Sequence, residues 1–160
     1  MEPCARTFIM KKKNILESEF AWCFEGENPQ QTFMLSSDES KKLWAEKIDP
    51  NNFHYFKLGN EAWVTQTDTQ LATNWVDSYN DDQLEDTTNA LNAVEECKED
   101  DIIYFCLNGS YIIESNWAEF KKHWRCFLCI YDDCPIVLHA SSNTIALIFS
   151  ARGAIFIAKQ

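Results

Sequence analysis

The last third of the chain has the apolar pattern of a β-sheet. Residues 101–107 contain six consecutive apolar side chains, which predicts a strand buried on both faces. Asn108-Gly109 follows it, a dipeptide typical of a two-residue hairpin in which both residues have positive φ. The apolar residues at 111–114 then predict the returning strand of the hairpin.

Further strand patterns follow at short intervals up to the C-terminus. Because the turns between them are short, neighbouring strands should be antiparallel. We expect these strands over residues 126–131, 135–140, 144–150 and 154–158. The prediction is a sheet of about five to six strands, mostly within residues 101–160, and residues 18–24 are a further candidate for a short strand.

The first hundred residues are more polar and carry helical signals. Ser36 and Glu39 have the spacing of a capping box, so a helix should begin there and end before Pro50. Residues 51–64 resemble an irregular aromatic loop. Apolar residues at helical spacing predict two more helices over residues 67–79 and 83–97, and a second capping box at Asn116 predicts a short fourth helix.

A chain of 160 residues is typical of one domain, and no internal repeat interrupts it. We expect residues 1–13 to be a flexible N-terminal lead. Residues 14–160 should form a single α+β domain, in which an antiparallel sheet packs against three or four helices.

Negative charge is concentrated in one part of this sequence. The formal net charge is −11, and residues 77–101 contain ten acids and one base, which is −9 of that total. Such a segment repels phosphate backbones, so direct binding of nucleic acid is disfavoured, whereas a basic protein would be attracted. The alternative is a solvated face that only keeps the protein in solution.

Seven cysteines, an odd number, occur without a secretory signal or an apolar run of membrane length. These features predict a cytoplasmic protein with free thiols and no membrane association. Cys126, Cys129 and Cys134 leave open a zinc- or redox-responsive site. In a strand, however, Cys126 and Cys129 would point to opposite faces, which favours buried structural thiols and no cofactor.

No catalytic motif is recognisable. His54, His123 and His139 stand apart from any motif that pairs histidine with serine or cysteine. The four glycines are too widely spaced to build a phosphate-binding loop. A pair of carboxylates brought together by folding would leave no trace in the sequence, so an enzyme with a scattered carboxylate or Cys/His site remains an alternative.

The segment from Tyr104 to Leu138 resembles the C-terminal part of a family of small bacterial proteins, a domain of unknown function with the pattern YFC…VIE..W..FK..WKNFL..DDG. The likeness is loose over residues 35–160 and better over 101–160. The chain departs from the pattern at Cys134, where the family has glycine, and by its extra Cys126 and Cys129. The resemblance implies a compact cytoplasmic bacterial domain and no particular chemistry. The matching residues are Tyr104, Phe105, Cys106, Ile113, Glu114, Trp117, Phe120, Lys121, Trp124, Phe127, Leu128, Asp132 and Asp133.

Our main hypothesis from the sequence is a non-catalytic, acidic protein-binding domain, similar in kind to immunity or inhibitor proteins. It would neutralise a basic protein partner such as a toxin or a nuclease, and the concentrated negative charge would speed their association. Trp63, in an irregular stretch, is a candidate exposed aromatic contact. The expected partner-binding residues are therefore Asp81, Asp82, Glu85, Asp86 and Trp63.

Overall fold

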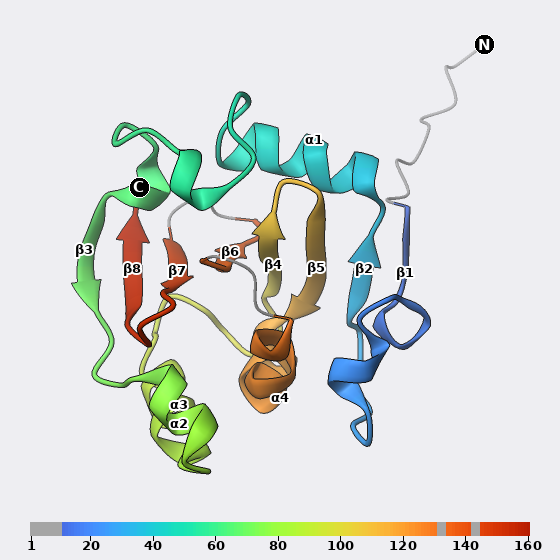
Figure 1. Cartoon of the computed structure of the whole chain (residues 1–160), viewed down its shortest axis with the longest axis vertical. Coiled ribbons are helices and arrows are strands. Elements are labelled where there is room, and N and C mark those ends of the chain that lie inside the picture. The colour runs from blue at the N-terminus through green and yellow to red at the C-terminus, as the bar shows by residue number, and fades with distance from the viewer. Residues whose placement is uncertain (1–10, 131–133, 142–144) are drawn as a thin grey trace.

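A computed structural model describes residues 11–130, 134–141 and 145–160 and contains one antiparallel sheet with helices on both faces (Figure 1). The strand order is β1-β2-β5-β4-β6-β7-β8-β3. The strands are β1 Lys12–Asn14, β2 Phe33–Leu35, β3 Thr67–Gln70, β4 Ile102–Asn108, β5 Tyr111–Asn116, β6 Ile136–His139, β7 Ile145–Phe149 and β8 Ile155–Lys159. The helices are α1 Ser37–Lys47, α2 Trp75–Asn80, α3 Leu84–Asn92 and α4 Trp117–Cys129, with 3-10 turns η1 Ile15–Glu17, η2 Ala21–Phe24, η3 Tyr55–Lys57 and η4 Trp63–Thr65.

The α+β class is confirmed, but the sheet has eight strands, so the expected five to six were too few. Five of the eight, β4 to β8, lie within residues 101–160, as predicted. The three strands that the sequence did not indicate are β1, β2 and β3, each of only three or four residues. A strand this short is too brief to show an alternating pattern.

The central strand β4 separates two hydrophobic cores. Ile103, Phe105 and Leu107 belong to the first core, together with residues of α2, α3 and α4. Tyr104 and Cys106 point the other way into the second core, which α1 covers. In Figure 1, α1 lies at the top of the view and α2, α3 and α4 lie at the bottom, on the other side of the sheet.

Two predicted capping boxes begin helices as expected. The Glu39 N–H donates to Ser36 Oγ at 3.2 Å, and the Glu119 N–H donates to Asn116 Oδ1 at 2.8 Å. Each such cap contributes about 1 kcal/mol to helix stability. No helix among the described residues is long and apolar enough to cross a membrane.

The predicted strand at residues 126–131 is wrong, because α4 continues to Cys129. Phe127 and Leu128 are buried and extend the apolar face of this helix into the first core. The backbone is non-helical at His123 (φ −118°, ψ 20°), so α4 is kinked there. The aromatic and β-prone residues after His123 resemble a strand when read alone, but burial in the core decides their conformation.

Three other predictions need correction. Residues 18–24 form no strand, since η2 occupies Ala21–Phe24 and the three residues before it form a turn. The helix expected over 67–79 begins only at Trp75, because Thr67–Gln70 pairs with β8 as an edge strand. The helix expected over 83–97 ends at Asn92, and the acids that follow would be unfavourable in a helical C-terminal turn.

Some predictions involve the chain ends and turns. Lys12 and Lys13 of the expected N-terminal lead form β1, whereas residues 1–10 lie outside the described residues. The turn expected between the predicted strands at 126–131 and 135–140 includes residues 132–133, which also lie outside them. The helix over residues 37–47 and the irregular aromatic loop that follows it are confirmed.

Gly109 in the β4–β5 hairpin is required by a close contact. The hairpin is confirmed, but Asn108 and Gly109 are not among the described residues with positive φ, so the expected turn conformation is wrong. The Gly109 N–H donates to the Phe53 carbonyl at 2.7 Å, and a Cβ atom at residue 109 would overlap the Phe53 ring. The aromatic loop therefore lies directly on the hairpin.

We predict that Gly109→Ala lowers the free energy of unfolding by about 1–3 kcal/mol, because the new methyl group must displace the Phe53 ring. Urea unfolding of the two proteins measures this difference. Gly59→Ala is the matched control, since a Cβ at residue 59 has no atom within 4 Å, and we expect a change of at most about 0.5 kcal/mol. Equal effects of the two substitutions would contradict the contact with Phe53.

Candidate functional site

Half of the acids in residues 77–101 form an exposed surface on two short helices. Asp77 belongs to α2, Asp81 and Asp82 to the turn after it, and Glu85 and Asp86 to the first turn of α3. All five side chains are exposed. We call this set of five residues the acidic ridge.

The core decides which way the acidic ridge faces. Trp75 of α2 and Leu91 of α3 are buried in the first core, and the partly buried Val76 and Leu84 pack against it. The Trp75 indole N–H donates to the Ser150 carbonyl at 2.9 Å, which fastens α2 to the end of β7. Because the apolar sides of both helices face the sheet, their carboxylates are left on the solvent side.

The other acids of residues 77–101 are mostly engaged within the fold. Glu96 accepts from Lys159 at 2.8 Å, and Glu99 accepts from Lys121 at 2.6 Å. The hydrogen bond from Lys159 is the main reason why the pKa of Glu96 is lowered. These carboxylates therefore hold chain segments together and are less available to a partner.

Asp101 is the most thoroughly bonded acid of this group. Its Oδ2 atom accepts from the Lys98 N–H at 2.8 Å and lies 2.8 Å from His139 Nε2. The backbone hydrogen bond from Lys98 and the hydrogen bond with His139 lower the pKa of Asp101. Asp101 thus links the start of β4 to the end of β6.

The acidic ridge has one ion pair with a basic side chain among the described residues. Arg125 Nη2 lies 3.5 Å from Asp82 Oδ1, and the guanidinium group also stacks on the Tyr79 ring at 4.9 Å from its centre. An exposed ion pair of this kind contributes about 0–1 kcal/mol. Asp77, Asp81, Glu85 and Asp86 have no ion pair with any described residue, so most of the ridge charge is uncompensated.

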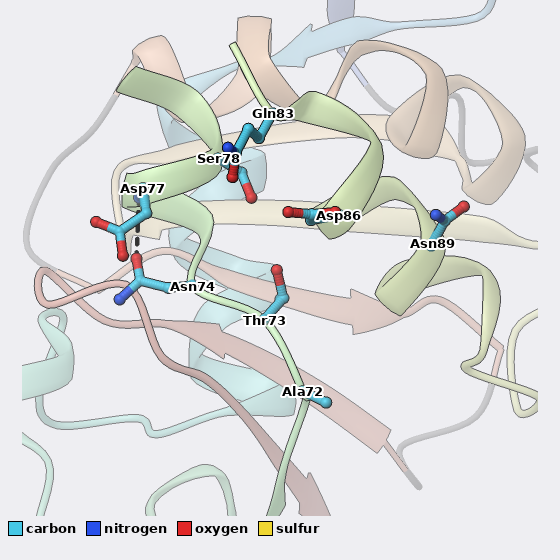
Figure 2. A pocket seen from close by; sticks show the side chains of 8 residues that line it. All are labelled: Ala72, Thr73, Asn74, Asp77, Ser78, Gln83, Asp86 and Asn89. Atoms are coloured by element: carbon cyan, nitrogen blue, oxygen red, sulfur yellow. Dashed lines mark hydrogen bonds between the residues drawn. The ribbon is translucent and has the colours of Figure 1, made fainter. Parts of the chain in front are cut away.

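A groove of about 320 Å³ lies between α2 and α3 beside the acidic ridge. Figure 2 shows its polar lining, with Asp86 of α3 lying between Ser78 of α2 and Asn89 further along α3. Its volume is near the lower end of the range for ligand pockets, which is about 300–1,000 Å³. The lining residues are Ala72, Thr73, Asn74, Asp77, Ser78, Gln83, Asp86 and Asn89.

The structure brings the four predicted acids together but places Trp63 elsewhere. Trp63 packs against the second core, on the opposite side of the sheet from α2 and α3. Its indole N–H donates to the Lys47 carbonyl at 2.9 Å, so the ring joins η4 to the end of α1. The most exposed tryptophan is instead Trp22 of η2, at 63%.

The three cysteines of the metal or redox alternative do not form one cluster. Cys126 packs against the first core, whereas Cys134 is buried in the second core. Cys23 lies beside Cys129, and burial raises the pKa of Cys23 to about 12 and that of Cys126 to about 11. Thiols held protonated in this way are poor metal ligands and nucleophiles. Among residues 11–130, 134–141 and 145–160, no group of three metal-ligating side chains is close enough to hold an ion.

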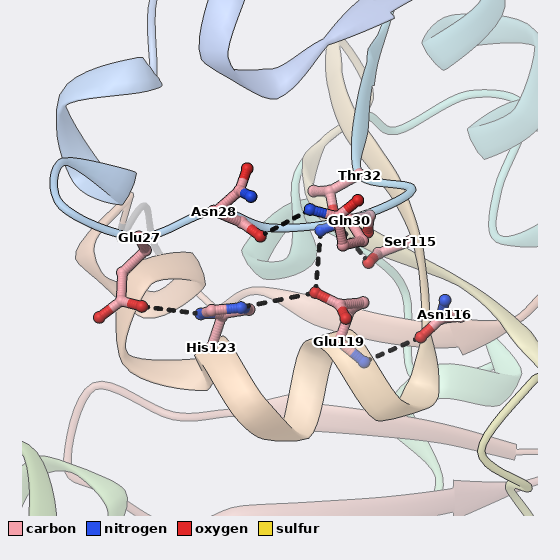
Figure 3. Close-up of polar contacts among 8 residues, drawn as sticks. All are labelled: Glu27, Asn28, Gln30, Thr32, Ser115, Asn116, Glu119 and His123. Carbon is pink, nitrogen blue, oxygen red and sulfur yellow. Dashed lines mark hydrogen bonds and ion pairs between the residues drawn. The ribbon is translucent and has the colours of Figure 1, made fainter.

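His123, which looks isolated in the sequence, is buried between two carboxylates (Figure 3). It is 5% exposed, and its Nδ1 atom lies 3.7 Å from Glu27 Oε2 while its Nε2 atom lies 3.4 Å from Glu119 Oε2. Neither ring nitrogen forms a hydrogen bond with these carboxylates. Nε2 is buried and has no hydrogen-bond partner among the described residues. Because both nitrogens face carboxylates, neither faces a serine or cysteine that it could activate.

The same polar cluster fastens residues 27–32 to α4 and β5. Glu119 Oε2 accepts from the Gln30 N–H at 3.0 Å, and the hydroxyl groups of Thr32 and Ser115 lie 2.8 Å apart (Figure 3). Thr32 and Ser115 are both buried, so this hydrogen bond is protected from water. The cluster thus attaches an irregular segment to the sheet.

This cluster is not apparent from the sequence, because its members come from distant parts of the chain. The separation of four residues between Glu119 and His123 was a visible local signal, since such residues are neighbours on a helix. Glu27 and Gln30 lie about ninety residues away, and nothing in their surroundings indicates a histidine partner.

We predict that Glu119→Ala lowers the free energy of unfolding by about 1–3 kcal/mol, because it removes the acceptor of the Gln30 N–H and one of the two carboxylates beside His123. Lys122→Ala, an exposed change on the same helix, should shift it by at most about 0.5 kcal/mol. Urea unfolding provides both values, and hydrogen exchange of the Gln30 amide should increase only in the Glu119 variant. Unchanged exchange at Gln30 would show that the cluster does not hold this segment.

Asp101 leads to a prediction about acid stability. Because its folded-state pKa is lowered, its stabilising effect is present above the ordinary pKa of 3.8 and is lost as the pH falls through the folded value. Asp101→Asn should therefore be less stable than the parent at about pH 6, and the two should converge towards about pH 2. Asp100→Asn changes an exposed neighbouring residue and should have the same stability as the parent at every pH. A constant difference for the Asp101 variant at every pH would refute this role.

Comparison with known proteins gives a family but no activity. No curated protein and no solved structure matches the chain. One family model, described as a protein of unknown function (DUF2947), matches residues 11–157, which is wider than the C-terminal resemblance seen in the sequence. The match spans the acidic ridge, the groove and every strand except the end of β8. Since it also covers well over half of the chain, the protein belongs to the DUF2947 family.

Proposed function

We propose that the protein is a non-catalytic binding domain that recognises a basic protein partner through the acidic ridge, in the manner of an immunity or inhibitor protein. The observation that carries the proposal is the uncompensated charge of the acidic ridge. Glu96, Glu99 and Asp101 are engaged within the fold, whereas four of the five ridge acids have no ion pair with a described residue. Glu95 and Asp100 are also exposed without an ion pair to a described residue, but they lie outside the ridge.

Uncompensated charge on one surface supports binding by electrostatic steering. A field of one sign raises the rate at which an oppositely charged protein meets the correct face, and salt weakens the effect. The same field opposes nucleic acid, since each nucleotide brings a negative phosphate group. The proposed partner is therefore a basic protein, such as a toxin or nuclease that itself binds nucleic acid.

The ridge is well placed for such a role because it contributes little to the fold. Its carboxylates lie on the solvent side of α2 and α3, and only Asp82 contacts a basic side chain of the described residues. Repulsion among neighbouring acids is unfavourable for folding, so a partner that neutralises them would relieve it. We further propose a bacterial cytoplasmic setting, which suits the free thiols.

The partner is first captured from a lysate at low salt with the tagged full chain, and then its association is measured with purified proteins. We predict that neutralising four ridge acids lowers the association rate constant about tenfold or more at low ionic strength. The difference should disappear at high salt. The variant is Asp81→Asn, Asp82→Asn, Glu85→Gln and Asp86→Asn.

A control variant makes the same change in net charge away from the ridge. Its four exposed carboxylates lie before α1 and between η3 and η4, so its association rate should be within about twofold of the parent. Equal slowing in both variants would show an effect of net charge alone, and no slowing in either would rule out the ridge as the binding surface. The control substitutions are Glu17→Gln, Glu19→Gln, Glu25→Gln and Glu61→Gln.

A further inference from the structure

We infer that the groove between α2 and α3 binds the guanidinium group of one arginine side chain of the partner. This inference rests on the proposed function and names the chemical group that the site would recognise. It starts from the groove lining, which contains two carboxylates and no basic side chain.

Two carboxylates in the groove lack partners. Asp77 and Asp86 stand on facing helices, and neither side chain has a hydrogen bond or ion pair with a described residue. They are two of the eight lining residues, one from each helix (Figure 2). The negative charge on both helices favours a ligand that carries positive charge.

Two lining residues of the groove, Thr73 and Ser78, are joined through the buried hydroxyl group of Thr87. The Thr87 hydroxyl donates to Ser78 Oγ at 2.9 Å, and the Thr73 and Thr87 oxygens lie 3.1 Å apart. A threonine hydroxyl has one proton, and Thr87 uses its proton towards Ser78, so Thr73 must donate to Thr87. The donor capacity of Thr73 is thereby used inside the protein, and its oxygen remains an acceptor at the groove.

One wall of the groove is fixed in place by Asn74. Its Oδ1 atom accepts from the Asp77 N–H at 3.0 Å, and its Nδ2 atom donates to the Arg152 carbonyl at 3.0 Å. Gly153 has φ +98°, and a Cβ atom there would overlap the Asn74 side chain, so only glycine allows this approach. The Asn74 amide is thus a rigid support of the wall, and one of its two N–H donors is used inside the protein.

Arginine matches this lining better than other cations do. Its planar group presents five N–H donors in a fixed fork, which suits acceptors spread over two helices, whereas lysine offers one compact charge. The amide oxygens of Gln83 and Asn89 can accept alongside the carboxylates. A metal ion would need more ligands, and the described residues contain no group of three metal-ligating side chains around a common point.

The test is a titration of the ¹⁵N-labelled full chain with N-acetyl-L-argininamide, followed by NMR. We expect amide shifts concentrated in residues 72–89 and an affinity at least about threefold higher than that of the lysine derivative. The citrulline derivative has nearly the same shape without the charge, and it should cause no shifts. Shifts outside the groove, equal affinity for lysine, or no shifts with the arginine derivative would overturn the inference.

Two single variants separate the groove from the general charge of the ridge. Asp86→Asn should weaken binding of the arginine derivative about tenfold, since it removes a charged acceptor from the lining. Glu85→Gln removes the same charge one residue away, outside the lining, and should change affinity by less than about twofold. Equal weakening by the two variants would overturn the inference.

Failure of this inference and failure of the proposed function give different results. If the four-site ridge variant slows association with the partner but Asp86→Asn and Glu85→Gln act alike, the ridge binds the partner without a specific arginine site. If the ridge variant has no effect on the partner while the arginine derivative still binds the groove, the proposed function fails and the ligand class of the groove stands.

Discussion

Strand β4 lies in the middle of the sheet and is buried on both faces, and the arrangement of the helices depends on this constraint. Alternate side chains of β4 require an apolar cover on each side. On one side, Phe105 contacts Phe120 and Phe127 of α4, with ring centres 6.1 and 5.3 Å apart. On the other side, Leu43 and Trp44 of α1 supply the cover. The apolar face of each helix therefore completes one of the two cores.

Sequence patterns gave reliable information where a local signal coincided with burial. The six apolar residues before Asn108 correctly indicated β4, and the two capping boxes correctly located the starts of α1 and α4. Residues 126–129 were misassigned because their composition suits a strand, and only packing against the first core keeps them in α4. The short strands β1, β2 and β3 depend on pairing with distant residues, which a local pattern cannot reveal.

The candidate site was only partly accessible from the sequence for a similar reason. Charge counting identified the segment at residues 77–101, but it could not distinguish Glu96, bonded to Lys159, from the uncompensated acids of the ridge. Those internal partners lie on other elements. Trp63 illustrates the same problem for an aromatic residue. Its irregular surroundings suggested an exposed side chain, but its indole N–H donates to the Lys47 carbonyl at the end of α1. Long-range contacts, and not residue type, decide which groups are available to a partner.

The two outermost strands of the sheet have a consequence for self-association. Any strand at the edge of a sheet has backbone groups that can pair with another chain, and long apolar edges lead to aggregation. Here the edges are β1, with exposed lysines, and β3, with four exposed polar residues, Thr67–Gln70. Because both edge strands are short and polar, they offer few backbone groups and little apolar surface for pairing with another chain. A sheet with a large apolar interior is thus protected at both edges against pairing with another chain, and the acidic ridge lies on helices rather than on a strand edge.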